Sequence, residues 1–232
     1  MLEQAFGRYS FNDAFNVTFG RQLTVLGFED DEAPGLYAVS TAYLASNDDV
    51  NPVGATVRRN YKDGTRLNFN NGQFGLSFGL HDGYWANDDF NGDNIAIDLA
   101  GSVMIIPGLE AQIGYAHEEV GDDDISQFNT WVSFSPNDLT LALEYDNYDV
   151  DVLDVDYWAL MLMANYQFAD WFAATLRYSH EDVDDAEADR LTFAFLFTIT
   201  DNLYFNVEYS TPNGDDTIPD YDEFYLESLL TF

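Results

Sequence analysis

The feature that most limits what this chain can form is a period of two in its apolar residues, repeated from near the first residue to the last. Side chains of a β-strand point alternately to its two faces, so each segment with this period predicts a strand with one apolar and one polar face. The segments that fit are residues 4–10, 15–20, 65–70, 73–82, 94–106, 109–118, 127–135, 139–148, 157–168, 171–180, 189–199, 202–211 and 221–232. The alternation therefore predicts an all-β fold of thirteen strands.

The connections between these segments are of two kinds, which alternate along the chain. One kind is short and built from turn-forming residues, at residues 12–13, 71–72, 107–108, 136–138, 169–170 and 201–202. The other is long and acidic, at residues 29–62, 83–93, 119–126, 149–156, 181–188 and 212–220. This pattern predicts a transmembrane up-and-down antiparallel β-barrel of about 12–16 strands, with short periplasmic turns and long acidic extracellular loops.

The charge of the chain excludes several classes of protein. It carries 42 acidic and 8 basic residues, a formal net charge of −34, which repels nucleic acid, so we expect no nucleic-acid partner. Aromatic residues make up 16% of the chain, which is unlike a disordered acidic tail. Cysteine is absent, which excludes disulfides, thiolate metal sites and a cysteine nucleophile.

The apolar faces favour a membrane over water. No apolar run reaches the 18 residues of a transmembrane helix, whereas a membrane-spanning strand needs only about 10 alternating residues. A soluble β-sandwich or lipocalin-like barrel is the main alternative, because half-buried strands alternate there too. Turned inward, however, these bulky apolar faces would surround a lumen too wide for them to fill. We therefore expect one domain, residues 1–232, in the outer membrane of a Gram-negative bacterium, in contact with lipid and lipopolysaccharide.

The odd number of predicted strands adds a further expectation. Single-chain bacterial barrels usually have an even number of strands, with both ends of the chain at the periplasmic rim. We therefore expect either strands that precede residue 1 or an extra strand within residues 29–62, where the sequence YAVSTAYLAS alternates weakly. The first ten residues also lack the regions of a secretory signal peptide, so we expect a signal that was removed or a chain that is part of a longer one.

Several short motifs resemble a known family. The last segment ends the chain on Phe232, as do closing strands of Gram-negative outer-membrane barrels. The pieces Gly20-Arg21, Leu26-Gly27-Phe28-Glu29, Gly64-Thr65-Arg66 and Gly83-Tyr84-Trp85 resemble the family of putative β-barrel porins of Gram-negative bacteria. The resemblance implies passive passage of small hydrophilic solutes, with some members forming homotrimers. Members usually carry strands before the segment that matches LEQAFGRYSF, and this chain has none there.

Charged residues on the polar faces are the best candidates for a functional role. A ring of charge in the wall of a pore selects ions. The candidates for lining the pore are Arg66, Glu144, Arg177, Arg190, Glu208 and Glu227. The alternative is that these charges are scattered over the lumen and form no ring.

The long connection at residues 29–62 is a candidate constriction loop. It is long enough to fold into the lumen, and Arg58, Arg59 and Lys62 are three of the chain's eight basic residues. Within the lumen they would form a filter for anionic solutes. The alternative is a surface loop with solvated charges.

Catalytic and metal sites are not predicted. No acidic loop has the ligand spacing of an EF-hand, and His81, His117 and His180 are expected as separate residues at the long-loop rim. No nucleophile elbow, phosphate-binding loop or zinc-protease motif occurs, so we expect no catalytic residue and no cofactor. The sequence predicts a porin that favours cations. A barrel plugged by its own loop, an outer-membrane hydrolase and a soluble acidic β-protein are the alternatives.

Overall fold

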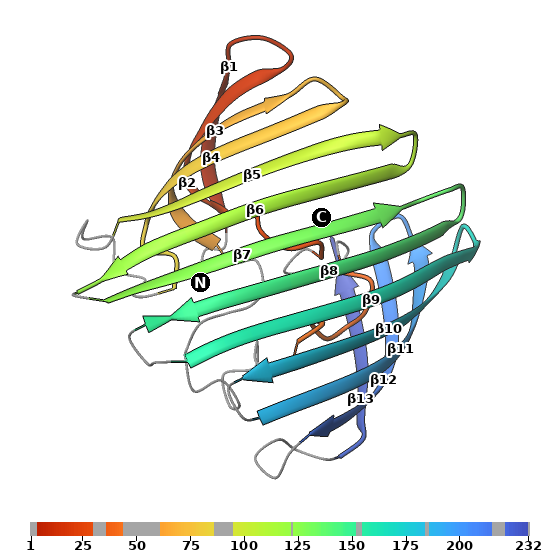
Figure 1. The fold of residues 1–232 in the computed structure, drawn as a ribbon. Helices are drawn as coiled ribbons and strands as arrows, with labels where there is room; N and C mark the ends of the chain where they lie inside the picture. Colours follow the sequence, from red (N-terminus) through yellow and green to blue (C-terminus); the bar gives the residue numbers. More distant parts are fainter. Residues whose placement is uncertain are drawn as a thin grey trace.

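The computed structural model describes residues 4–29, 36–43, 61–85, 95–121, 123–151, 155–183, 186–214 and 221–231. These form thirteen strands, as predicted: β1 (Ala5–Ser10), β2 (Phe15–Leu23), β3 (Tyr61–Asn70), β4 (Phe74–Asp82), β5 (Ile95–Ile106), β6 (Leu109–Val120), β7 (Asp123–Phe134), β8 (Leu139–Val150), β9 (Val155–Ala169), β10 (Phe172–Val183), β11 (Ala186–Thr200), β12 (Leu203–Gly214) and β13 (Glu223–Leu230). Each strand pairs with its neighbours in sequence, in one sheet that runs in order from β1 to β13 (Figure 1). The predicted up-and-down antiparallel topology is confirmed. Within the described residues, no helix is long and apolar enough to cross a membrane.

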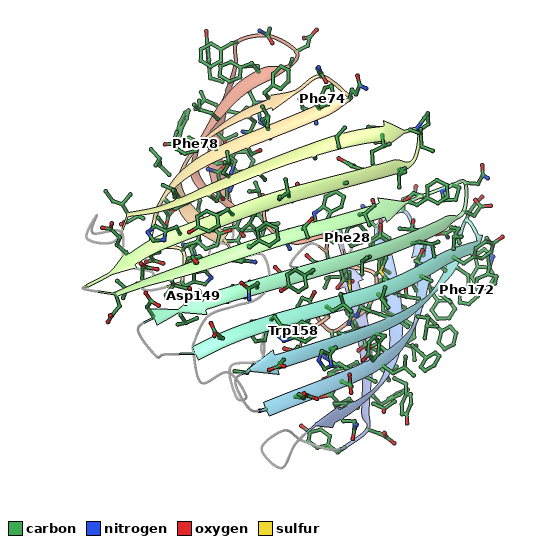
Figure 2. All side chains as sticks on the ribbon, viewed as in Figure 1. Phe28, Phe74, Phe78, Asp149, Trp158 and Phe172 are labelled. Atoms are coloured by element: carbon green, nitrogen blue, oxygen red, sulfur yellow. The ribbon has the colours of Figure 1, made fainter. Side chains whose placement is uncertain are left out.

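The two faces of the curved sheet have opposite chemistry. Large apolar side chains project from the outer face and are exposed, among them Phe74, Phe78, Leu99, Leu162, Phe193 and Leu226 (Figure 2 labels Phe74, Phe78 and Phe172). Polar and charged side chains on the inner face are buried, among them Thr18, Asp98, Asn129, Glu144, Arg177 and Glu208. The apolar faces are therefore turned outward, as expected for a barrel whose solvent on the outside is lipid.

The short turns bring their strands together at one end of the sheet (Figure 1). The turn between β5 and β6 has Gly108 at a φ of 84°, and the turn between β7 and β8 has Asn137 at a φ of 53°. Glycine and asparagine tolerate this left-handed conformation better than other residues, which explains why these turns are tight.

At the opposite end, several strands extend further than the alternation predicts. β6 and β7 pair as far as Val120 with Asp123, and β10 and β11 pair as far as Val183 with Ala186. Most of residues 119–126 and 181–188, predicted as loops, therefore lies in hairpins. The alternation of apolar and polar residues marks only the part of a strand with an apolar outer face, whereas the backbone pairing continues beyond it.

The connection between β2 and β3 also has different limits from those predicted. β3 begins at Tyr61, so Lys62 belongs to a strand and not to the loop. Lys62 lies on the inner face of β3, is buried, and is paired with Gln22 across the ladder. No strand is found in residues 24–29 and 36–43, the part of the connection that the structure describes. The expectation of strands before residue 1 stays a prediction.

Candidate functional site

Residues 24–29 and 36–43, named here the inner segment, lie within the curve of the sheet (Figure 1). The backbone of the first part is bound by side chains from successive strands. Gln112 of β6 donates to the Val25 carbonyl (3.0 Å), and Asn129 of β7 accepts from the Gly27 N–H (3.2 Å). Glu144 of β8 accepts from the Phe28 N–H (2.8 Å). These contacts direct the inner segment across the strands, rather than along any one of them.

A socket of small residues holds Leu26 against the wall. Leu26 is buried with Ala96, Ala100 and Ala116 of β5 and β6. Gly114 completes the socket, because a side chain at this position would overlap the Leu26 side chain. Small residues on the inner face of two strands therefore let the inner segment approach the backbone of the wall closely.

Arg177 of β10 joins the two parts of the inner segment. Its guanidinium donates to both carboxylate oxygens of Glu29 (3.0 and 2.7 Å) and to the carbonyls of Ser40 (2.8 Å) and Thr41 (2.9 Å). Only 1% of Arg177 is exposed. One terminal nitrogen of the guanidinium thus binds the Glu29 carboxylate, and the other binds the two carbonyls. Because hydrogen bonds between charged groups are strong, this buried contact fixes the positions of both parts of the segment.

Glu208 of β12 holds the second part of the inner segment. Its carboxylate accepts hydrogen bonds from the Val39 N–H (2.6 Å), the Ser40 N–H (2.8 Å) and the Ser40 hydroxyl. Arg190 of the neighbouring strand lies 3.9 Å from Glu208 and donates to the Thr41 carbonyl (3.3 Å). Glu208 and Arg190 thus bind residues 39–41 of the inner segment from adjacent strands.

An acidic pair on β8 lies beneath the same segment. Asn129 donates to both Glu144 and Asp146 (2.9 Å each), and Gln127 donates to Asp146 (2.9 Å). Tyr43 of the inner segment packs in an apolar cluster with residues of β8 and β9, including Tyr148, Tyr157 and Met161. Amide donors and aromatic rings therefore surround two buried carboxylates.

A second buried charge cluster lies where the inner segment leaves β2. Arg66 of β3 donates to the Leu23 carbonyl (2.8 Å) and to Asp98 of β5 (3.1 Å). His81 of β4 lies 3.0 Å from the same Asp98 oxygen. His81 is the next-to-last residue of β4, at the strand end where the sequence places it, and only 3% of it is exposed. Among the residues that the structure describes, no group of three His, Asp or Glu side chains is placed to hold a metal ion.

Replacing Asp98 by asparagine is expected to destabilise the barrel. The change leaves the Arg66 guanidinium buried without its counter-charge, and breaking a buried ion pair in this way costs about 3–5 kcal/mol. The measurement is the urea midpoint of folding into lipid vesicles. The control is Asp63→Asn, which breaks the partly exposed pair with Arg21 (3.1 Å) and is expected to cost less than about 1 kcal/mol. Equal shifts in the two variants would contradict the structural role of Asp98.

The structure brings some of the sequence-predicted residues together and separates others. Arg177, Arg190 and Glu208 gather around residues 39–41, while Glu144 binds the inner segment at Phe28. Arg66 pairs with Asp98 on the inner face, near the point where the inner segment leaves β2, and Glu227 of β13 accepts from Asn206 (2.8 Å). Arg58 and Arg59 lie outside the described residues.

Sequence reasoning missed several residues that contact these groups. Asp146 lies two positions after Glu144 and Asp98 lies on the inner face of β5, so strand parity alone was enough to include both. In the sequence, Glu29 is only the end of a short motif. Its partner Arg177 lies 148 residues further along the chain, and no local pattern connects the two.

An apolar outer face, a polar inner face and an antiparallel meander with tight turns at one end define an outer-membrane β-barrel of the porin class. Residues 1–224 match the family model described as putative beta-barrel porin-2, OmpL-like. The chain belongs to this family and, like its relatives, lies in the outer membrane of a Gram-negative bacterium. A comparison with curated protein sequences gave no match.

Solved structures show the same fold at low sequence identity. OmpF of Salmonella typhi, solved in complex with daunomycin, has a TM-score of 0.67 and 11% identity over 97% of this chain and 87% of its own. A loop-deletion mutant of the outer-membrane protein OmpT of Vibrio cholerae has a TM-score of 0.64 and 14% identity over 94% and 76%. An anion-selective porin from Comamonas acidovorans has a TM-score of 0.62 and 15% identity over 93% and 69%.

Proposed function

We propose that the protein is a diffusion channel for small hydrophilic solutes and ions, with a lumen narrowed by the inner segment. The observation that carries the proposal is the reversed polarity of the sheet: exposed apolar side chains outside and polar side chains inside. A polar inner wall does not form an apolar core. It lowers the free-energy cost of moving water and ions across the membrane. Membership of a porin family supports the same function.

The charges of the inner wall support a preference for cations. Its described carboxylates outnumber its described basic groups: the carboxylates include Asp98, Glu110, Glu118, Glu144, Asp146, Glu181, Glu208, Glu223 and Glu227, and the basic groups are Arg8, Lys62, Arg66, Arg177 and Arg190. Arg66, Arg177 and Arg190 are each within ion-pair distance of a carboxylate. Their charge is therefore largely neutralised, and a low-dielectric wall concentrates the remaining negative field in the lumen.

The proposal gives the candidate residues two roles. Arg177, Arg190, Glu144 and Glu208 hold the constriction by binding the inner segment, and the pore is the space that the segment leaves free. Glu227, on the inner face of β13, contributes charge to the wall, and no covalent step takes place. If the channel prefers anions instead, Arg58, Arg59 and Lys62 become the best candidates for the selectivity filter.

Purified, refolded protein is expected to form channels in a planar lipid bilayer, with a reversal potential in a potassium chloride gradient that indicates cation preference. Electrostatic selection is screened by salt, so the preference is expected to weaken when the salt concentration is raised well above about 0.15 M. Conductance of single channels and reversal potential are the measurements. Protein that inserts but never conducts would overturn the proposal.

The second candidate is a barrel that its own inner segment closes. It is favoured by one observation: Glu144, Arg177 and Glu208 are all buried and bind the inner segment, so the segment covers this part of the wall. The bilayer measurement separates the two candidates, because a closed barrel inserts without conductance until the inner segment is released.

A further inference from the structure

The outer face carries a groove that the channel function does not use. It has a volume of about 260 Å³ and lies over β8–β11. Two small residues in its lining, Ala164 of β9 and Ala174 of β10, stand among much larger ones. Ala164 is paired with Leu176, and Ala174 is paired with Tyr166 on one side and Phe195 on the other. The groove therefore exists because two alanines interrupt a wall of large apolar side chains.

The groove lies near the end of the sheet that carries the short turns. Phe168, which also lines it, is the next-to-last residue of β9, and the turn at Asp170 and Trp171 follows directly. Stacked rings continue from there around the outer face, with Phe168 5.4 Å from Phe172 and Phe172 5.2 Å from Phe197. In Figure 2, Phe172 lies at this end of the strands. Since short turns of outer-membrane barrels face the periplasm, the groove opens into the periplasmic leaflet.

We propose that this groove binds one acyl chain of a phospholipid from the periplasmic leaflet. The groove is continuous with the exposed apolar face that contacts lipid in the membrane. The side chains that line an unfilled groove have fewer dispersion contacts than those of a filled one. A flexible hydrocarbon chain follows an irregular wall of rings and methyl groups better than a rigid protein surface does. The rings beside it add contact area without losing side-chain freedom, because they are already stacked.

The charges of the neighbouring turns select the headgroup. Asp138, Asp170 and Asp201 lie in the three turns nearest the groove, and these turns contain no basic residue. An ammonium headgroup is attracted to this rim, whereas a headgroup with net negative charge is repelled. The ligand is therefore a phospholipid with a primary amine, such as phosphatidylethanolamine, rather than phosphatidylglycerol.

The test is native mass spectrometry of the protein released from mixed vesicles of phosphatidylethanolamine and phosphatidylglycerol. Wild-type protein is expected to retain one phosphatidylethanolamine molecule. Ala174→Phe fills the groove and is expected to lower the retained fraction about tenfold. If two methylene groups of the acyl chain are no longer buried against the protein, the affinity for the lipid falls by roughly that factor. Ala174→Leu is expected to give a smaller loss.

The matched control is Ala111→Phe, which adds the same ring to the outer face of β6, also near a short turn. Heat-modified migration on gels shows that each variant is folded. Equal lipid retention by Ala174→Phe and Ala111→Phe would overturn the acyl site. Retention of both lipids in equal amounts by wild type, or no change on Asp170→Asn, would overturn the headgroup assignment. If Ala174→Phe instead dissociates an oligomer without losing lipid, the groove is an interface between copies and the proposal fails.

Discussion

Arg177→Glu is expected to raise both the conductance and the cation preference of the channel. The change removes the donor that binds Glu29, Ser40 and Thr41, and it places a carboxylate where Glu29 needs a cation. Breaking a buried ion pair costs about 3–5 kcal/mol, which shifts the ratio of attached to released inner segment by a factor of about 10²–10⁴. Released, the segment no longer narrows the lumen, and the wall gains negative charge. Single-channel conductance and reversal potential measure the two effects.

Arg21→Glu provides the matched control for this prediction. It makes the same charge change on the outer face, where Arg21 pairs with Asp63 at 3.1 Å. A partly exposed pair contributes about 0–1 kcal/mol, so conductance and reversal potential are expected to stay near those of the wild type. An unchanged reversal potential in folded Arg177→Glu would show that Arg177 does not act on the permeation path.

A charge in the middle of the lipid-facing band is expected to prevent folding into the membrane. Leu162 lies near the middle of β9 on the outer face, where 46% of it is exposed. Leu162→Arg places a guanidinium in hydrocarbon, which costs about 2–4 kcal/mol near the bilayer midplane. The yield of heat-modifiable, protease-resistant protein after refolding into vesicles is the measurement.

The same substitution at a strand end tests the dependence on depth. Ile95 is the first residue of β5, at the end of the sheet away from the short turns, and 66% of it is exposed. Ile95→Arg is expected to cost about 0–1 kcal/mol, because the guanidinium reaches water and headgroups. A yield for Leu162→Arg as high as that for Ile95→Arg would place the lipid band elsewhere on the strands.

The number of strands and the direction of their faces could be predicted because both depend on local patterns. In β10, the order Leu176, Arg177, Tyr178 shows which side chains share a face, and the structure places them accordingly. The ends of the strands were harder to predict, because β6 and β7 pair through an acidic region that has no long apolar alternation. Ile125 and Val120 at these ends pack against residues from other parts of the chain, and such contacts leave no period in the sequence.

The contacts of the candidate site depend on the position of the inner segment, which the alternation of residues along a strand does not indicate. Alternation places Glu144, Arg177 and Glu208 on the inner face, but it does not say what lies against them. The answer is the backbone of the inner segment, which bears amide and carbonyl groups at every residue whatever its sequence. Only the position of the segment in space decides which wall residue meets which of these groups.

The inner segment also has a consequence for the order of assembly. In a meander each hairpin forms between neighbours in sequence, so the wall has few distant contacts to wait for. The hydrogen bonds of Gly27, Phe28 and Val39 instead span 102, 116 and 169 residues. They require β7, β8 and β12 to be in place, so they form late, after most of the entropy of ordering the strands has been lost. Folding is therefore expected to show a final slow phase, in which the inner segment binds to strands that are already inserted in the membrane.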